Sequence, residues 1–397
     1  AQALLNRPGD ANVSPLAVYR HAAKADSVQQ RRPNVVLIMM ESMSAKFMKH
    51  FGQSETLTPF LDSLYTRSIS FRNFYSAGIH TNHGLYATLY SFPAMMKRNL
   101  MKGSVIPRYS GLPTVLKENG YYNLFFMTHE GQYDNMNAFF RTNGYDEVFS
   151  QEDYPVDKVV NSFGVQDDFL YDYAIPVLNQ RAATGQPFFA TLLSISNHPP
   201  YVIPPFFHPK TSEPEMQIVE YADWALRQFF EEARKQPWFD NTIFVLEGDH
   251  GKLVGDAECE LPESYNHIPL MIYSSRIQPE EKTAFGGQVD IQPTILGLLN
   301  IDYLQNNFGV DLLKEERPCM FYTADNMVVG RNDTLLYLYN YETQQELTYD
   351  IGNGKLNAVP MDDSFFPLKE YSFSMLQSAE FLVKHGKTLN SIPFTQQ

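Results

Sequence analysis

The sequence has little cysteine, few tryptophans and a deficit of positive charge. Only Cys259 and Cys319 occur, and no Cys-x-x-Cys pair is present, which excludes a cysteine-based zinc motif and permits at most one disulfide. Two unpaired thiols are the alternative. Lys and Arg total 31 against 45 Asp and Glu, so the formal net charge is −14 at pH 7. This balance argues against binding of nucleic acid through a general basic surface.

Long hydrophobic runs are also lacking. The longest, such as residues 35–40 and 243–246, are far shorter than the ~20 residues that a membrane-spanning helix requires. The chain begins at Ala1 without a Met or a signal sequence, and we expect that an upstream signal or membrane anchor has been removed. With 44% hydrophobic and 19% charged residues in 397, the composition is that of a folded globular protein.

Four apolar runs without alternation predict strands that are buried on both faces of a parallel sheet. They cover residues 34–40, 122–127, 187–194 and 242–246, and each is followed by polar or ionisable residues. Helix-compatible stretches lie between them, at 58–68, 84–90, 112–119 and 215–236. This alternation predicts an α/β fold with a mainly parallel central sheet and helices on both faces.

The character of the chain changes along its length, which predicts three parts. Residues 1–32 form a polar lead-in segment with a helix-compatible run at 14–30. Residues 33–318 are expected to form a large α/β domain. Residues 319–397 form a small antiparallel α+β subdomain, with strands expected at 320–323, 335–339 and 346–351 and a closing helix at 368–384.

Ionisable residues gather where the predicted strands end. In open α/β sheets, ligands bind at the carboxyl ends of the strands, so we expect the following side chains to converge: Glu41, His129, His198, Asp249 and His250. A helix cap is the alternative role for Glu41 taken alone. Two carboxylates and one imidazole suit Mn²⁺ or Zn²⁺, and at least one further ligand is needed.

Thr81 is the candidate for the missing ligand. It lies in a loop that leads into the helix-compatible stretch 84–90, where backbone N–H groups favour an anion. A simple N-cap is the alternative role. Coordination to a metal lowers the pKa of a hydroxyl and makes it a usable nucleophile, so a phosphate or sulfate ester is the substrate that fits such a site best.

Five segments carry a resemblance to a known family. The segments are 34–42, 58–64, the loop that holds Thr81, 196–201 and 247–251. In this order they resemble the lipoteichoic acid synthase and sulfatase-like branch of the alkaline phosphatase superfamily, over residues 33 to 318. The resemblance implies an alkaline-phosphatase-like fold.

The resemblance also implies roles for individual residues. One divalent cation, typically Mn²⁺ with Zn²⁺, Mg²⁺ or Ca²⁺ as alternatives, would be held by Glu41, Thr81, Asp249 and His250. Thr81 would be the nucleophile of a ping-pong reaction on a phosphodiester. Three histidines would contact the substrate, with His198 at the phosphate or the leaving group: His129, His198 and His267.

Relatives of this kind act outside the cytoplasm on lipid head groups and are tethered by N-terminal membrane helices. The resemblance therefore implies an extracytoplasmic phosphotransferase or phosphodiesterase acting on phosphoglycerol or phosphoethanolamine groups. The Trp and Arg that lipoteichoic acid synthases use for phosphoglycerol are not matched in 131–141. A sulfatase-like hydrolase of glycan esters is the alternative, although Thr81 stands where true sulfatases need Cys or Ser. A non-catalytic member that binds a head group or glycan is a third possibility.

Overall fold

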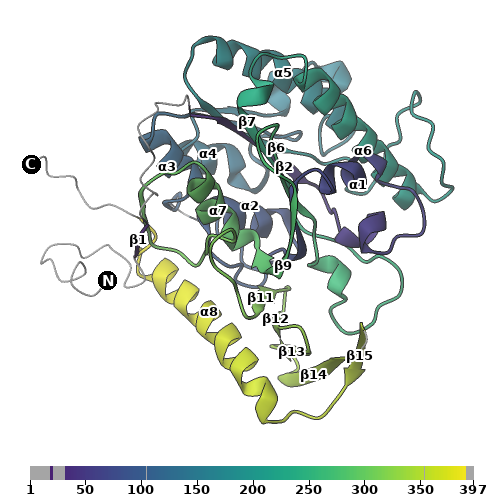
Figure 1. Ribbon diagram of the computed structural model, residues 1–397, viewed down its shortest axis with the longest axis vertical. Coiled ribbons are helices and arrows are strands. Elements are labelled where there is room, and N and C mark those ends of the chain that lie inside the picture. Colours follow the sequence, from purple (N-terminus) through teal and green to yellow (C-terminus); the bar gives the residue numbers. More distant parts are fainter. Residues whose placement is uncertain (1–17, 21–31, 104, 353, 390–397) are drawn as a thin grey trace, which may run out of the picture.

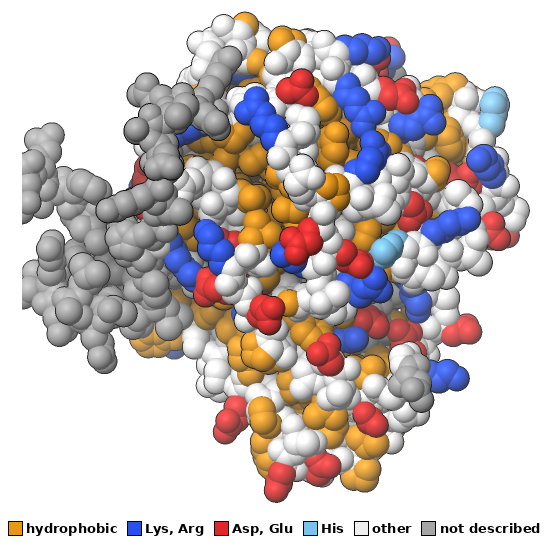
Figure 2. Space-filling view, in the orientation of Figure 1, with side chains coloured by type: hydrophobic (Ala, Val, Ile, Leu, Met, Phe, Trp, Pro, Cys, Tyr) orange, Lys and Arg blue, Asp and Glu red, His pale blue; other side chains and the backbone are white. Residues whose placement is uncertain are grey.

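The computed structural model describes residues 18–20, 32–103, 105–352 and 354–389. A large sheet with helices on both faces occupies most of the molecule, and a smaller sheet with one long helix lies at its lower end in Figure 1. On the face shown in Figure 2, Lys and Arg side chains are interspersed with Asp and Glu.

The central sheet has eight strands, and β8 runs opposite to the other seven. Their order across the sheet is β5-β4-β6-β2-β7-β8-β3-β9. The mainly parallel sheet expected from the sequence is thus confirmed. The strands are β2 (Asn34–Met40), β3 (Ile69–Tyr75), β4 (Tyr122–Phe126), β5 (Glu147–Phe149), β6 (Phe188–Leu193), β7 (Thr242–Gly248), β8 (Leu270–Tyr273) and β9 (Glu280–Gly287).

The continuous apolar runs arise because both faces of the sheet are covered by helices. Along β2, Val35, Leu37 and Met39 pack into one hydrophobic layer, and the alternate residues pack into the other. The first layer contains α2 (Thr81–Tyr90), α3 (Leu112–Glu118), α4 (Met136–Thr142) and α7 (Ile291–Leu298). The second contains α1 (Pro59–Tyr65), α5 (Asp167–Ala183) and α6 (Pro214–Ala233) (Figure 1).

The neighbouring strands β2 and β7 position the site. They pair in parallel, and the last residues, Met40 and Gly248, lie in register. The residues that follow, Glu41 and Asp249, therefore emerge side by side at the carboxyl edge of the sheet.

The C-terminal part contains a separate five-stranded antiparallel sheet with α8 packed against it. Tyr322 of this sheet stacks on Tyr75 of β3, with 5.5 Å between the ring centroids, so the two sheets share a hydrophobic cluster. The elements are β11 (Met320–Thr323), β12 (Met327–Arg331), β13 (Leu335–Asn340), β14 (Gln345–Gly352), β15 (Lys355–Ala358) and α8 (Phe366–Lys384). The division of the chain at 318/319 stays a prediction.

Some local expectations were wrong. Within the predicted helix 14–30, residues Val18–Arg20 form strand β1, which pairs antiparallel with β10 (Tyr303–Gln305); the rest of that prediction lies outside the described residues. Helix α2 begins at Thr81 rather than at Gly84. Helix α5 was not predicted, because its sequence contains Pro176 and its apolar residues keep no clear helical period.

Cys259 and Cys319 are free thiols, in agreement with the alternative of unpaired cysteines. Among the described residues, no helix is both long and apolar enough to cross a membrane.

Candidate metal centre and active site

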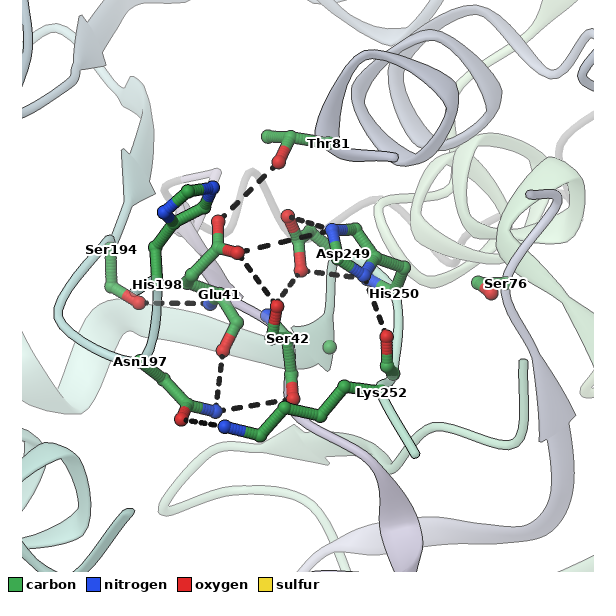
Figure 3. Close-up of polar contacts among 12 residues, drawn as sticks. Glu41, Ser42, Ser76, Thr81, Ser194, Asn197, His198, Asp249, His250 and Lys252 are labelled. Carbon is green, nitrogen blue, oxygen red and sulfur yellow. Dashed lines mark hydrogen bonds and ion pairs between the residues drawn. The ribbon is translucent and has the colours of Figure 1, made fainter. Parts of the chain in front are cut away.

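Three of the expected ligands meet at the carboxyl edge of the central sheet. Glu41, Asp249 and His250 each place one ligand atom within 4.8 Å of the others (Figure 3). Glu41 follows β2, and Asp249 and His250 follow β7. Both carboxylates are almost fully buried, with 2% of Glu41 and none of Asp249 exposed.

Backbone and side-chain hydrogen bonds fix the orientation of both carboxylates. Asp249 Oδ1 accepts from Ser42 N at 2.8 Å and from His250 N at 2.7 Å. Glu41 Oε1 accepts from Ser42 Oγ at 2.7 Å. Asp249 Oδ2 has no hydrogen-bond partner and is buried. One carboxylate oxygen of Asp249 is therefore free for a ligand that the chain itself does not supply.

Burial is the main cause that raises the pKa of Glu41 well above its ordinary value, and the nearby Asp249 raises it further. Two carboxylates taken out of water so close together repel each other when both are ionised. A bound cation offsets this repulsion, so the electrostatics of the pair favour a metal site.

The imidazole of His250 is oriented for coordination. Its Nδ1 lies 2.7 Å from the Gly251 carbonyl oxygen and must therefore carry the proton and donate it. The other nitrogen, Nε2, lies 3.5 Å from Asp249 Oδ2 and 3.9 Å from Glu41 Oε1, and it is the atom that the neutral ring offers to a metal ion. A backbone carbonyl that fixes the tautomer in this way is a regular feature of histidine ligands.

Thr81 lies at the edge of this cluster. It is the first residue of α2, and its Oγ1 donates to Glu41 Oε2 at 3.4 Å. Figure 3 shows the hydroxyl directed toward the Glu41 carboxylate. The loop before α2 thus brings the expected nucleophile to the expected ligands.

A second group of polar residues binds the backbone carbonyl groups of Glu41 and Ser42. Asn197 Nδ2 donates to the carbonyl oxygens of Glu41 and Ser42, at 3.1 Å each. Lys252 Nζ in turn donates to Asn197 Oδ1 at 2.7 Å (Figure 3). It also donates to Tyr201 Oη at 3.1 Å. Burial lowers the pKa of Lys252 to about 8.

His198 and His129 lie in an aromatic arc beside the site. The His198 ring is 4.0 Å from the Phe163 ring, Phe163 is 6.3 Å from Tyr133, and Tyr133 is 4.6 Å from His129. His198 donates from Nδ1 to the Pro199 carbonyl at 2.6 Å, which leaves its Nε2 free. Burial lowers the pKa of His129 and so favours its neutral form.

His267 is not part of the cluster. Its Nε2 lies 2.8 Å from the Arg72 carbonyl oxygen, and its ring stacks on Tyr75 at 5.1 Å. Burial lowers its pKa. The structure therefore brings Glu41, Thr81, Asp249 and His250 together and leaves His267 with partners of its own.

The residues present fit a divalent cation. Two carboxylates, one imidazole with a free Nε2 and a neighbouring hydroxyl form a mixed oxygen and nitrogen donor set of the kind that Mn²⁺ and Zn²⁺ accept. The unpaired Asp249 Oδ2 is the observation that calls for such an ion.

Sequence reasoning missed the residues that support the ligands. Ser42 follows Glu41 in the sequence, and Asn197 precedes His198. Their position beside a predicted site residue was the sequence feature that could have identified them. Lys252 follows the Asp249-His250-Gly251 motif by one position. No sequence signal marked Phe163 or Tyr133.

Fold and site together define the class of protein, an α/β fold of the alkaline phosphatase type with a candidate metal centre at the carboxyl ends of its strands. The family model described as "Sulfatase" matches residues 33–301. The chain therefore belongs to the sulfatase family.

Relatives within the superfamily agree with this placement. Lipoteichoic acid synthase 2 of Bacillus subtilis is 24% identical over 71% of this chain and 47% of its own length. The chain spans about half the length of the curated relatives that it matches.

Solved structures agree as well. A protein in the alkaline phosphatase superfamily from Vibrio parahaemolyticus is similar with a TM-score of 0.83 and 27% identity, over 95% of this chain and 92% of that one. The lipoteichoic acid synthase LtaP from Listeria monocytogenes is similar with a TM-score of 0.77 and 21% identity, over 89% of this chain and 93% of that one. The expected alkaline-phosphatase-like fold is thus confirmed.

Proposed function

We propose that the chain is the catalytic part of a metal-dependent phosphotransferase or phosphodiesterase that acts on a phospholipid-type head group, phosphoglycerol or phosphoethanolamine. The observation that carries this proposal is the Thr81 hydroxyl at 3.4 Å from Glu41, beside Asp249 and His250. Similarity to lipoteichoic acid synthases supports a phosphodiester rather than a sulfate ester as substrate.

Glu41, Asp249 and His250, with Thr81 as fourth donor, would hold one divalent cation, Mn²⁺ before Zn²⁺, Mg²⁺ or Ca²⁺. When bound, the cation supplies positive charge that lowers the pKa of the Thr81 hydroxyl and stabilises negative charge on the phosphate oxygens.

In the proposed reaction, Thr81 is the nucleophile and three histidines contact the substrate. Thr81 Oγ gives its proton to solvent and attacks phosphorus, an O–P bond forms to Thr81, and the bond from phosphorus to the lipid oxygen breaks. The leaving oxygen takes up a proton and departs as the alcohol. His198 faces the substrate with its free Nε2, and His129 and His267 are the further proposed substrate contacts. In the second half-reaction an acceptor alcohol or water displaces Thr81 and restores its hydroxyl.

The proposed setting is the outer face of the cytoplasmic membrane or the periplasm, with the membrane reached through an N-terminal anchor. The curated relatives, about twice as long as the matched region, support a longer parent protein. The proposed division is a lead-in segment 1–32, a catalytic domain 33–318 and a subdomain 319–397.

A sulfatase-like hydrolase of sulfate or phosphate esters on glycans is the second candidate. The match of the "Sulfatase" family model over residues 33–301 favours it. The threonine at position 81 speaks against the formylglycine chemistry of true sulfatases.

Two measurements separate the candidates. With Mn²⁺ present, the protein is expected to release diacylglycerol from vesicles of phosphatidylglycerol or phosphatidylethanolamine, and to cleave bis(4-nitrophenyl) phosphate faster than 4-nitrophenyl sulfate. Faster cleavage of the sulfate would overturn the phosphotransferase proposal in favour of the hydrolase.

A further inference from the structure

A fully buried glutamine lies behind the candidate metal centre, outside every motif that the sequence analysis singled out. Gln288 is 1% exposed and begins the short 3-10 helix Gln288–Asp290 between β9 and α7. A primary amide carries a donor and an acceptor on one planar group, so a buried glutamine can join two segments of backbone that lie on opposite sides of it.

Gln288 uses both ends of its amide in this way. Its Oε1 accepts from the backbone N–H of Ala77 at 2.9 Å. Its Nε2 donates to the carbonyl oxygen of Asp249 at 2.7 Å and to that of Gly248 at 3.1 Å. These partners fix the orientation of the amide, because an N–H can only face the oxygen and two carbonyls can only face the nitrogen.

The two segments that Gln288 joins carry the two halves of the site. Ala77 belongs to the loop that leads to Thr81. Gly248 ends β7, and Asp249, one of the proposed metal ligands, follows it. The contact between them is tight: a Cβ on Gly84 of α2 would lie 2.3 Å from the Asp249 carbonyl oxygen and 3.0 Å from Gln288 Nε2. Helix α2 therefore has no free space on this side.

A second link lies deeper in the same interface. Thr88 of α2 donates from Oγ1 to Glu247 Oε1 of β7 at 2.6 Å. The segment that carries Thr81 is thus linked to the β7 end at two points: Gln288 binds the loop before α2, and Thr88 binds from the helix itself.

We infer that Gln288 is a positioning residue that sets the distance between Thr81 and the Asp249-His250 ligand pair. The inference rests on the proposed metal site and adds to it a residue that touches neither metal nor substrate. A glutamate at this position would keep the acceptor for Ala77 N–H but would place a carboxylate oxygen against two carbonyl oxygens. Loss of the donor alone is therefore expected to disturb the Asp249 backbone.

Gln292 provides a matched control four positions along the chain. It is also fully buried, and its Oε1 accepts from Ser91 Oγ at 3.1 Å and from Asn307 Nδ2 at 2.9 Å, with no contact to the ligand loop. Its Nε2 has no hydrogen-bond partner, so substitutions at Gln292 control for a changed or charged side chain in the buried interior, without loss of a bond to the Asp249 backbone.

Isothermal titration calorimetry measures the Mn²⁺ dissociation constant of Gln288→Glu and of its control Gln292→Glu. Gln288→Asn and Gln292→Asn form a second, milder pair. Circular dichroism checks that each variant is folded. The dissociation constant of the Gln288 variants is expected to rise at least tenfold over wild type, while that of the folded Gln292 variants stays within about twofold of wild type. If Gln288→Glu does not fold, Gln288→Asn decides.

Equal Mn²⁺ affinity of the folded Gln288 and Gln292 variants would overturn the inference and leave the proposed function standing. Absence of Mn²⁺ binding by the wild-type protein would instead overturn the proposed function itself. A rise in the dissociation constant that is equally large at both positions would show a general packing effect and would also overturn the positioning role.

Discussion

Thr81 Oγ1 lies 3.4 Å from Glu41 Oε2, although the two residues are 40 positions apart, Thr81 at the start of α2 and Glu41 directly after β2. The relationship joins the start of helix α2 to the end of strand β2. It gives the threonine a position next to the proposed metal ligands that a simple helix cap would not need.

Replacement of Thr81 by alanine is expected to reduce phosphodiester turnover by about four orders of magnitude or more, because the proposed nucleophile is lost. The fold is expected to remain, since one partly exposed hydroxyl contributes little to the core. Turnover and Mn²⁺ binding are measured together, with Thr142→Ala at the exposed end of α4 as control. Near wild-type turnover in the Thr81 variant would remove the nucleophile assignment.

Replacement of Asp249 by alanine is expected to abolish both Mn²⁺ binding and activity, because the free Oδ2 and the fixed Oδ1 are lost together. In the wild-type protein, Mn²⁺ at about 100 times its dissociation constant adds about 2.7 kcal/mol to the free energy of unfolding. That metal-dependent rise in Tm is expected to disappear in Asp249→Ala and to persist in the exposed control Asp256→Ala. Unchanged metal content would exclude Asp249 as a ligand.

Replacement of Lys252 by methionine is expected to lower the free energy of unfolding by about 1–3 kcal/mol, because Asn197 Oδ1 loses its charged donor in a buried place. The looser Asn197 would hold the Glu41 and Ser42 carbonyls less firmly, so kcat/KM is expected to fall about tenfold. Urea unfolding and steady-state kinetics check both effects. The surface variant Lys235→Met serves as control, and equal behaviour of the two variants would refute the supporting role.

Asp223 is expected to make stability depend on pH. Its carboxylate accepts from the backbone N–H groups of Phe60 and Leu61 at the start of α1, at 2.9 Å each. Burial is the main cause that raises its pKa from 3.8 to about 7, and the two N–H groups lower it in part. The folded chain therefore keeps a proton that the unfolded chain releases, so this contribution to stability is complete below about pH 4 and is lost as the pH rises through about 7.

Urea unfolding of wild type and Asp223→Asn between about pH 5 and pH 8 measures this effect. The free energy of unfolding of wild type is expected to fall with rising pH relative to that of the variant, by up to a few kcal/mol. Parallel pH profiles would contradict the raised pKa.

Sequence reasoning predicted that Glu41, Asp249 and His250 converge, because their positions follow from a general property of parallel sheets. Glu41 and Asp249 come directly after apolar runs, and the carboxyl ends of adjacent parallel strands meet at one edge. The supporting contacts obey no such local rule. Gln288 meets Ala77 across 211 positions, and only the folded chain brings them together.

The difference between local pattern and long-range contact also explains an error in the predicted secondary structure. Residues Val18–Arg20 fit a helical pattern locally, but pairing with Tyr303–Gln305 at the far end of the domain makes them a strand. His267 was proposed as a substrate contact from its resemblance to a His-x-Pro element, and this role stays a proposal. In the structure its ring lies against the Arg72 carbonyl and the Tyr75 ring.

The most direct test of the account is peptide mapping by mass spectrometry of the Mn²⁺-loaded protein after incubation with phosphatidylglycerol or phosphatidylethanolamine vesicles and rapid acid quenching. The account predicts a phosphoglycerol or phosphoethanolamine adduct on the peptide that contains Thr81, absent from Thr81→Ala. An adduct on another residue, or diacylglycerol release by Thr81→Ala at the wild-type rate, would contradict it.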